Sequence, residues 1–333
     1  PLYYTIPSTL FGAIFCYILL LSSTDAHSSE TDDNAKVNPK SSCSYKVYNL
    51  PGYQFVSPIV SATEECEAAE LSPIKEMVGG YIDQEKQSGS INNASVYIRA
   101  LKNGEWASIN PEMGYHPGSL IKLPMLMTFL HMAEVEPSLL NKEVIYNKSE
   151  VSPMKQTYET ASIQVGHKYT IKDLLHYMIA YSDNSATQLL ARFMNIDVTN
   201  KLFTDLGLTP PSNDSNYFNY RINAKDYSTF MESLYNASYL TIPASEYATS
   251  LLAACNFKNG MMRELPGNVR VAHKFGEAGN GMDHELHESG IVYLNDRPYL
   301  ITIMTHGNDV QKLSDVISHI SKMVYDKMSG PNI

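Results

Sequence analysis

Hydrophobic and polar positions follow two different repeats along this chain, and each repeat predicts a different kind of element. Through the middle of the sequence and at its end, apolar residues recur every three to four positions, which is typical of helices that bury one face. The predicted helices cover residues 120–131, 171–180, 186–194, 198–206, 224–234, a segment after Leu240, and 310–328.

The second repeat has a period of two and lies toward both ends of the folded part, where it predicts strands. A helix precedes the first strand, because Ser72 followed by Pro73 is typical of a helix start that runs toward Glu85. Strands at both ends with helices between them predict one lobe built from distant segments, one helical lobe and a cleft where they meet. The predicted strands cover residues 94–101 and 106–109, joined by an Asn-Gly turn, then 269–274, 289–294 and 299–305.

The start of the chain has a different composition. Residues 3–22 contain no charged side chain, and a mostly small-residue stretch follows up to Ala26. This pattern predicts that residues 1–26 are a signal peptide or a membrane anchor. We therefore expect an exported protein that is periplasmic, extracellular or anchored facing outward, with a linker and N-terminal segment over residues 27–70 and a catalytic domain over 71–330.

Composition and charge narrow the class of protein. The 333 residues are 44% hydrophobic, enough for a sizeable core, and the formal net charge is -10 with both signs mixed along the chain. The chain has no basic stripe that would neutralise phosphates, so nucleic acid is not an expected partner. We also expect the protein to be a monomer. Cys43 and Cys66 are able to pair in an oxidising compartment, whereas Cys255 lies in an apolar helical pattern and is expected to be a small core residue.

A serine followed three residues later by a lysine places a hydroxyl and an amine on adjacent turns of a helix start, so the lysine is able to take the serine proton. The pattern arises readily by chance. In two of its three instances a proline follows the serine, which a helix cap or a turn explains. The three pairs are Ser72/Lys75, Ser119/Lys122 and Ser152/Lys155.

Ser119 has different surroundings from the other two serines. It follows a Pro-Gly turn and begins a strongly apolar helix, which predicts that Lys122 points into a buried environment. A buried lysine is costly unless it is paired, neutral or functional. The alternative is that Ser119 only caps the helix while Lys122 extends to solvent.

Two further short motifs occur later in the chain. Ser182-Asp183-Asn184 joins two predicted helices, and Lys274-Phe275-Gly276 ends a predicted strand. Each alone has a simple structural explanation, because these residue types are common in caps and turns. Together with the Ser119 pair, in this order, they resemble the penicillin-recognising serine enzymes and most closely the class A β-lactamases, over residues 71–328.

The resemblance implies a fold and a reaction. The fold is α+β, β-lactamase/transpeptidase-like, with a five-stranded antiparallel sheet lobe and flanking helices, an inserted all-α lobe, and the active site in the cleft between them. Ser119 would attack an amide or lactam carbonyl and form an acyl-enzyme, with Lys122 as the base or as the group that orients the base. Ser182 would pass a proton to the departing nitrogen, and Asn184 would hold Lys122 and the substrate amide.

The late strand would complete that site. By resemblance, Lys274 attracts a substrate carboxylate and, as a like charge, pushes Lys122 toward its neutral form. The backbone N–H groups of Ser119 and Glu277 would form the oxyanion hole. The substrate-binding residues are then Asn184, Lys274, Phe275 and Gly276, the substrate is a β-lactam or a peptidoglycan-like peptide, and no cofactor is expected.

The sequence departs from the class A pattern at two places that affect the expected reaction. Residues 209–222 contain no glutamate to activate water for deacylation, and Asp214 is their only carboxylate. Phe275 replaces the Thr or Ser usual in the family's Lys-Thr-Gly motif, which puts the β-lactam preference in doubt. Two alternatives therefore remain. One is a penicillin-binding or D,D-peptidase-like enzyme with slow deacylation, and the other is a non-catalytic wall-binding relative.

The stretch 283–288 offers a competing metal hypothesis. It contains His284 and His287, but it lacks the His-Glu-x-x-His spacing that puts two imidazoles on one helical face. We expect a polar loop near the cleft there, and no metal.

Overall fold

The computed structural model describes residues 43–52, 54–55, 57–152, 157–158, 161–211, 220–295 and 297–330. The chain from Cys43 onward forms one compact unit. The predicted signal peptide or anchor at residues 1–26, Lys155 and Asp214 lie outside the described residues. Within the described residues, no helix has the length and apolar character needed to cross a membrane.

A five-stranded sheet in the order β4-β3-β9-β8-β7 forms the centre of one lobe. Every neighbouring pair in it is antiparallel. The expected five-stranded antiparallel sheet is therefore confirmed, and β7 is an edge strand. The strands are β3 (Asn93–Ala100), β4 (Trp106–Ile109), β7 (Arg270–Asn280), β8 (Asp283–Tyr293) and β9 (Tyr299–Gly307).

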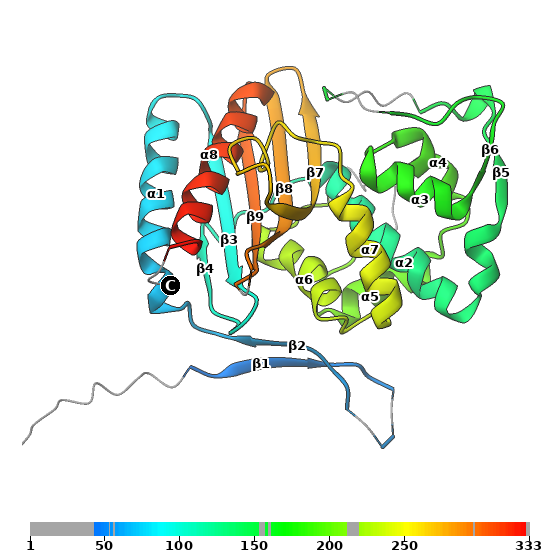
Figure 1. Cartoon of the computed structure of the whole chain (residues 1–333), viewed down its shortest axis with the longest axis horizontal. Coiled ribbons are helices and arrows are strands. Elements are labelled where there is room, and N and C mark those ends of the chain that lie inside the picture. The colour runs from blue at the N-terminus through cyan, green and yellow to red at the C-terminus, as the bar shows by residue number, and fades with distance from the viewer. Residues whose placement is uncertain are drawn as a thin grey trace, which may run out of the picture. The chain divides into compact units, whose positions relative to one another are not determined.

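Helices cover both faces of this sheet, as Figure 1 shows. The first and last helices pack on one face, and α6 with the rest of the helical lobe packs on the other. The helices are α1 (Ser72–Gln87), α2 (Lys122–Val135), α3 (Ile171–Ala180), α4 (Asn184–Ala191), α5 (Ile196–Asp205), α6 (Ala224–Tyr235), α7 (Ile242–Ala253) and α8 (Val310–Met328).

Helix starts follow from local capping chemistry. Thr170 and Asp173 form a capping box before α3, and the Asp309 side chain accepts two backbone N–H groups at the start of α8. Both helices have the predicted bounds. Ser72 was expected to cap α1, but it is the first helical residue, with Leu71 at the cap position and Pro73 in the first turn.

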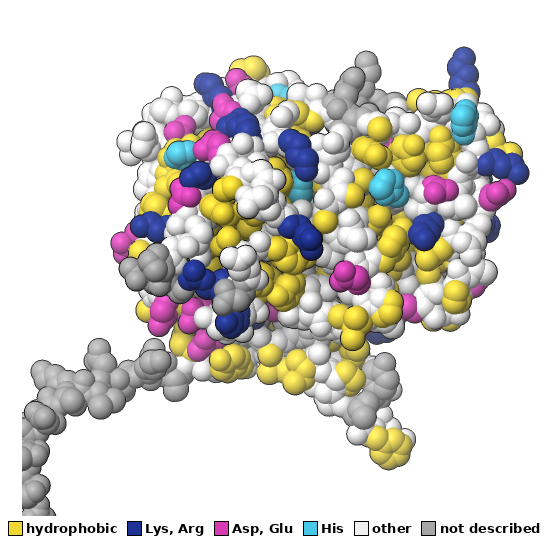
Figure 2. Space-filling model, in the orientation of Figure 1, with side chains coloured by type: hydrophobic (Ala, Val, Ile, Leu, Met, Phe, Trp, Pro, Cys, Tyr) yellow, Lys and Arg dark blue, Asp and Glu magenta, His cyan; other side chains and the backbone are white. Residues whose placement is uncertain are grey.

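The N-terminal part of the described chain contains a hairpin that the sequence pattern did not predict. Its strands β1 (Tyr45–Asn49) and β2 (Ile59–Glu64) are antiparallel. A disulfide joins Cys43 and Cys66 across its base. Figure 2 shows hydrophobic side chains on its surface. Tyr45 and Ile59 are exposed hydrophobic residues of the two strands. A second short hairpin in the helical lobe pairs β5 (Glu143–Ile145) with β6 (Lys168–Thr170).

The prediction of a polar loop at residues 283–288 is wrong. These residues are the first half of β8 and pair along their whole length with β7. Glu285, His287 and Glu288 are buried and bond other protein groups. Glu285 and His287 bond the backbone of His116, and Glu288 bonds the His273 ring. A strand is usually predicted from hydrophobic residues at every second position. Charged residues at buried positions of β8 break this repeat, so this half of the strand was not predicted.

Candidate active site

The candidate nucleophile lies on a short 3-10 turn, Gly118–Ile121, that leads directly into α2. Ser119 is half-buried there, and its carbonyl accepts the backbone N–H of Lys122. Almost every residue of the first half of α2 is buried, because this helix is apolar on all sides and lies inside the helical lobe. Lys122 is consequently only 3% exposed, as its position in the sequence predicts.

Two glycines bring this turn against the edge strand β7. A Cβ on Gly276 would collide with the carbonyl of Pro117 and would lie 2.8 Å from the backbone nitrogen of Leu120. Gly118, at a φ of 51°, would likewise collide with the carbonyl of Glu277. The missing side chains therefore let the backbone of residues 117–120 approach that of residues 276–277.

Three polar contacts hold the Lys122 amine in place. Its Nζ atom donates to the Ser182 carbonyl at 2.6 Å, to Asn184 Oδ1 at 2.7 Å and to Ser182 Oγ at 3.2 Å. Burial, and next the like charge of Lys274, hold the pKa of Lys122 well below its usual range, although Asp183 opposes the shift. A lowered pKa favours the neutral amine, which is the form of lysine that accepts a proton.

Ser182 connects the two lysines. Its Oγ atom lies 3.2 Å from Lys122 Nζ and accepts a hydrogen bond from Lys274 Nζ at 2.9 Å. The residue has a φ of 54°, a conformation that costs an L-residue free energy and that is found mainly where the surroundings enforce it. The turn between α3 and α4 thus holds this hydroxyl between both amines.

Asp183 fixes that turn and is not available for chemistry. Its side chain caps α4 by accepting from the N–H groups of Ser185 and Ala186. It also accepts from the backbone of Ile163 at 2.8 Å and from the Ser162 hydroxyl at 3.0 Å. Asn184 begins α4 and directs its amide oxygen to Lys122.

Lys274 reaches the same point from β7 and is fully buried. Its ammonium also donates to the carbonyl of Phe275 at 2.7 Å. Burial lowers the pKa of Lys274 to about 8, while Cys255 and Glu288 oppose that shift. The Phe275 ring is 1% exposed and stacks on Phe257 at 4.2 Å between ring centres.

The structure thus brings together Lys122, Ser182, Asn184 and Lys274, and it places the Ser119 turn against residues 276–277. Strand alternation turns the Phe275 side chain toward Cys255 and Phe257, with which it packs. The Lys274 Nζ atom lies 4.3 Å from the centre of the Phe275 ring, so Phe275 adjoins this group through Lys274.

The turn before Ser119 is held by residues that the sequence pattern missed. Glu285 accepts the backbone N–H of His116 at 2.7 Å and lies 3.6 Å from Arg221. The ring of His287 bonds the His116 carbonyl at 2.9 Å. The alternation of Glu285 and His287 along β8 was the available signal, and the expectation of a loop concealed it.

The side chain of Glu277 makes a further contact that the sequence did not indicate. Its carboxylate accepts the backbone N–H of Thr157 at 2.9 Å and the Thr157 hydroxyl at 2.5 Å. Residues 157–158 are thereby fixed to β7 beside the candidate site.

The described residues offer no metal cluster at this position. They contain no group of three or more His, Cys, Asp or Glu side chains arranged to hold a metal ion. A cavity of about 540 Å³ lies between the N-terminal hairpin, β4 and α6, and is lined by Lys46, Trp106 and Lys225 among others. None of the five candidate catalytic residues lines it.

Comparison with known families identifies the protein's relatives. A profile described as the β-lactamase enzyme family matches residues 80–328, which is most of the chain. The protein belongs to this family. Comparison with curated protein sequences gives no significant match.

Solved structures with the same fold span most of this β-lactamase-family chain. PBP-A is 19% identical with a TM-score of 0.65, over 77% of this chain and 96% of its own. The TLA-1 extended-spectrum β-lactamase is 16% identical with a TM-score of 0.67, over 77% and 99%. A class A β-lactamase from Bacteroides cellulosilyticus is 18% identical with a TM-score of 0.66, over 77% and 98%. These likenesses confirm the predicted β-lactamase/transpeptidase-like fold.

Proposed function

We propose that this β-lactamase-family protein is an exported serine hydrolase in which a β-lactam or a related amide acylates Ser119. The observation that carries the proposal is the pair of buried amines that share the Ser182 hydroxyl, one of them a lysine with a strongly depressed pKa three residues after Ser119. A neutral amine at that position provides the base that a serine nucleophile needs.

Each residue has one role in this proposal. Lys122 takes the Ser119 proton as the hydroxyl attacks the carbonyl carbon. The negative charge on the carbonyl oxygen is then stabilised by the backbone N–H groups of Ser119 and Glu277, a kind of contact worth about 3 kcal/mol per donor. Ser182 passes a proton to the departing nitrogen, and Asn184 holds Lys122 and the substrate amide.

The lifetime of the acyl-enzyme separates two forms of this function. Residues 209–222 contain no glutamate. Without a positioned base to activate water, hydrolysis of the ester is expected to be slow, which favours a penicillin-binding activity over efficient β-lactam turnover. A point mutant of PBP-A, one of the similar structures, is an acyl-enzyme complex with penicillin G.

The test follows turnover and adduct together. Wild type and Ser119→Ala are mixed with penicillin G and with a chromogenic cephalosporin, and intact mass and absorbance are recorded over time. We expect a long-lived adduct of one drug molecule on wild type, slow colour release and no adduct on Ser119→Ala. Fast turnover would make the protein an efficient β-lactamase with another route to water, and the absence of both signals would refute the β-lactam assignment.

A further inference from the structure

A cluster of three titratable side chains lies on the face of β7 and β8 that is turned away from the candidate site. Cys255, His273 and Glu288 are each at most 1% exposed, and the proposed mechanism uses none of them. The His273 Nδ1 atom lies 2.5 Å from Glu288 Oε1, and the other carboxylate oxygen accepts the backbone N–H of Met261 at 2.7 Å. Glu288 is thus a fixed, fully buried carboxylate.

Cys255 is the third member of the cluster and interacts electrostatically with the histidine. The Cys255 thiol is close to the His273 ring, while the Nε2 atom of that ring makes no hydrogen bond with the described residues. Burial lowers the pKa of His273, but Cys255 and Glu288 raise it by more, to about 10. A thiol with a neutral imidazole and a thiolate with an imidazolium have the same total charge, so with ionised Glu288 the three residues carry a net charge of -1.

Lys274 is the positive charge next to this cluster. It follows His273 in β7, and its partner in the strand ladder is Ser289, the neighbour of Glu288. A wholly buried ammonium is strongly destabilising unless an anion lies near it. The charged groups of the candidate site and its neighbourhood are Lys122 on α2, Asp183 before α4, Glu277 on β7 and the cluster of Cys255, His273 and Glu288. Lys122 interacts electrostatically with Lys274, and so do Cys255 and Glu288 of the cluster.

The carboxylates of Asp183 and Glu277 already have other hydrogen-bond partners. Asp183 accepts hydrogen bonds from the start of α4 and from Ile163, and Glu277 holds Thr157. Cys255 and Glu288 are the two groups whose charges raise the pKa of Lys274. Charge balance therefore couples Lys274 to the cluster across the thickness of one strand ladder.

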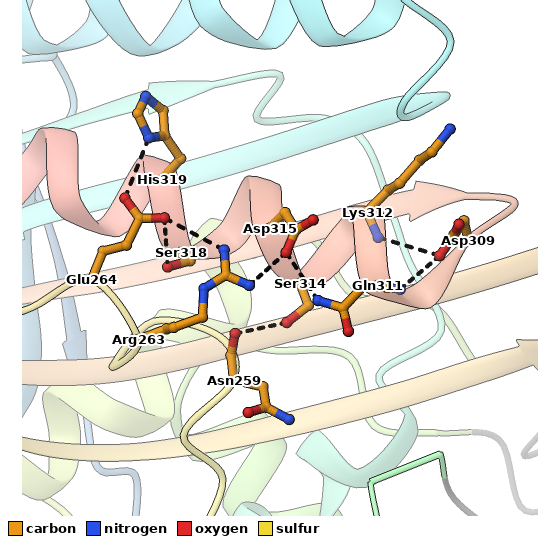
Figure 3. A network of polar contacts seen from close by, with 10 residues as sticks. All are labelled: Asn259, Arg263, Glu264, Asp309, Gln311, Lys312, Ser314, Asp315, Ser318 and His319. Carbon is orange, nitrogen blue, oxygen red and sulfur yellow. Dashed lines mark hydrogen bonds and ion pairs between the residues drawn. The ribbon is translucent and has the colours of Figure 1, made fainter.

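The cluster is covered by a segment that helix α8 holds in place. A side chain at Gly260 would collide with the Glu288 carboxylate, so the backbone closes directly over it. Figure 3 shows how this segment is attached: Asn259 accepts from Ser314 at 2.8 Å, and Arg263 pairs with Asp315 at 2.5 Å. This cover keeps water away from the carboxylate and so preserves its electrostatic effect.

We propose that the buried Glu288 carboxylate, with His273 and Cys255, is the counter-charge that keeps the Lys274 ammonium protonated, which makes Glu288 a positioning residue for the pair of amines on Ser182. The inference rests on the proposed function, in which Lys122 is the base, and the charge of Lys274 is one cause of the lowered pKa of Lys122. It assigns a role to residues on the far face of the sheet, outside any contact with substrate.

The first test is the pH profile of acylation by penicillin G for wild type, Glu288→Gln and Glu264→Gln. Glu288→Gln keeps the shape and the oxygen that accepts from Met261 but removes the charge. We expect its alkaline limb to move to lower pH by at least one unit, a tenfold fall in the proton affinity of Lys274. Glu264→Gln makes the same chemical change on the outer side of the covering segment, and its profile should match that of wild type. An unchanged alkaline limb in Glu288→Gln, or an equal shift in both variants, would overturn the proposal.

The second test does not depend on activity. Thermal unfolding is measured for wild type, Lys274→Met, Glu288→Gln and the double variant. If the two charges compensate each other, each single variant leaves one of them buried alone, and the double variant loses less stability than the sum of the single losses. Additive losses would contradict the pairing even if the protein forms the expected acyl-enzyme. Compensation without any acylation would retain the charge pair and reject only the proposed function.

Discussion

At the scale of single residues, the candidate site combines a strained backbone with unusual burial of charge. Ser182 adopts a positive φ while its hydroxyl contacts two buried amines. Strain of this kind persists where surrounding contacts determine the geometry, here the cap by Asp183 and the hydrogen bonds of Lys122. Substitutions at Ser182 separate the effect of the backbone strain from the effect of the hydroxyl.

We predict that Ser182→Gly is about 1 kcal/mol more stable than Ser182→Ala, because both lack the hydroxyl but only glycine adopts this φ without cost. Both variants should acylate about 100-fold more slowly than wild type, since the proton path to the departing nitrogen is lost. Denaturant unfolding and the rate of adduct formation with penicillin G measure the two effects. Equal stability of the two variants would show that the backbone at this position is unstrained.

The like charges of the two lysines predict a pH effect with a definite sign. Acylation requires neutral Lys122, so its rate falls as pH falls through the pKa of that group. Lys274 is one cause of the lowered pKa, and its removal therefore raises the pKa of Lys122. Lys274→Met should move the acid limb of the acylation profile to higher pH, whereas the exposed Lys312→Met should leave it in place. A shift to lower pH would contradict the assignment of Lys122 as the base.

At the scale of elements, the site depends on how closely the 3-10 turn approaches β7. The glycine at 276 permits this approach, and a methyl group there would meet the backbone of Pro117 and Leu120. We predict that Gly276→Ala slows acylation by at least about 100-fold, because it displaces the nucleophile from the oxyanion-hole backbone. Gly79→Ala, in α1 with open space around it, should acylate like wild type. Rapid acylation by Gly276→Ala would mean that Ser119 does not act against β7.

Individual helices and strands show how far the sequence predicts the structure. The helices α3 and α8 have the predicted bounds because each joins an amphipathic pattern to a side-chain cap. The helix expected from Leu120 begins two residues later, after a 3-10 turn that leaves no mark in the hydrophobic pattern. The charged half of β8 and the mostly exposed β1 lack the alternation of hydrophobic with polar residues by which strands are usually predicted.

Sequence motifs predict which residues form the candidate site, but only the three-dimensional fold shows which of them are in contact. Lys122, Ser182 and Lys274 are far apart in sequence, yet one hydroxyl contacts both amines. The support from Glu285 and the burial of Glu288 follow from strand register, which a single sequence does not specify.

At the scale of the whole molecule, the N-terminal hairpin is a separate attachment to the family fold. The family profile begins at residue 80, well after the hairpin, and the candidate site lies at the opposite edge of the sheet from the cavity that the hairpin lines. The disulfide between Cys43 and Cys66 closes a loop with a sequence separation of 23, a constraint worth about 3 kcal/mol.

We predict that replacing Cys43 and Cys66 together with serine makes the hairpin sensitive to protease while the acylation rate stays within about twofold of wild type. Limited proteolysis and the rate of adduct formation measure this, and reduced wild type serves as the control. Loss of acylation in the disulfide-free protein would mean that the hairpin contributes to the site.

The central claim is that Ser119 is the residue that becomes acylated, and locating the adduct tests it most directly. The full chain is incubated with penicillin G, digested, and its peptides are sequenced by tandem mass spectrometry, with Ser119→Ala treated in parallel. The account predicts one penicilloyl group, on Ser119, and none anywhere on Ser119→Ala. An adduct on another residue, or one that persists in Ser119→Ala, would contradict it.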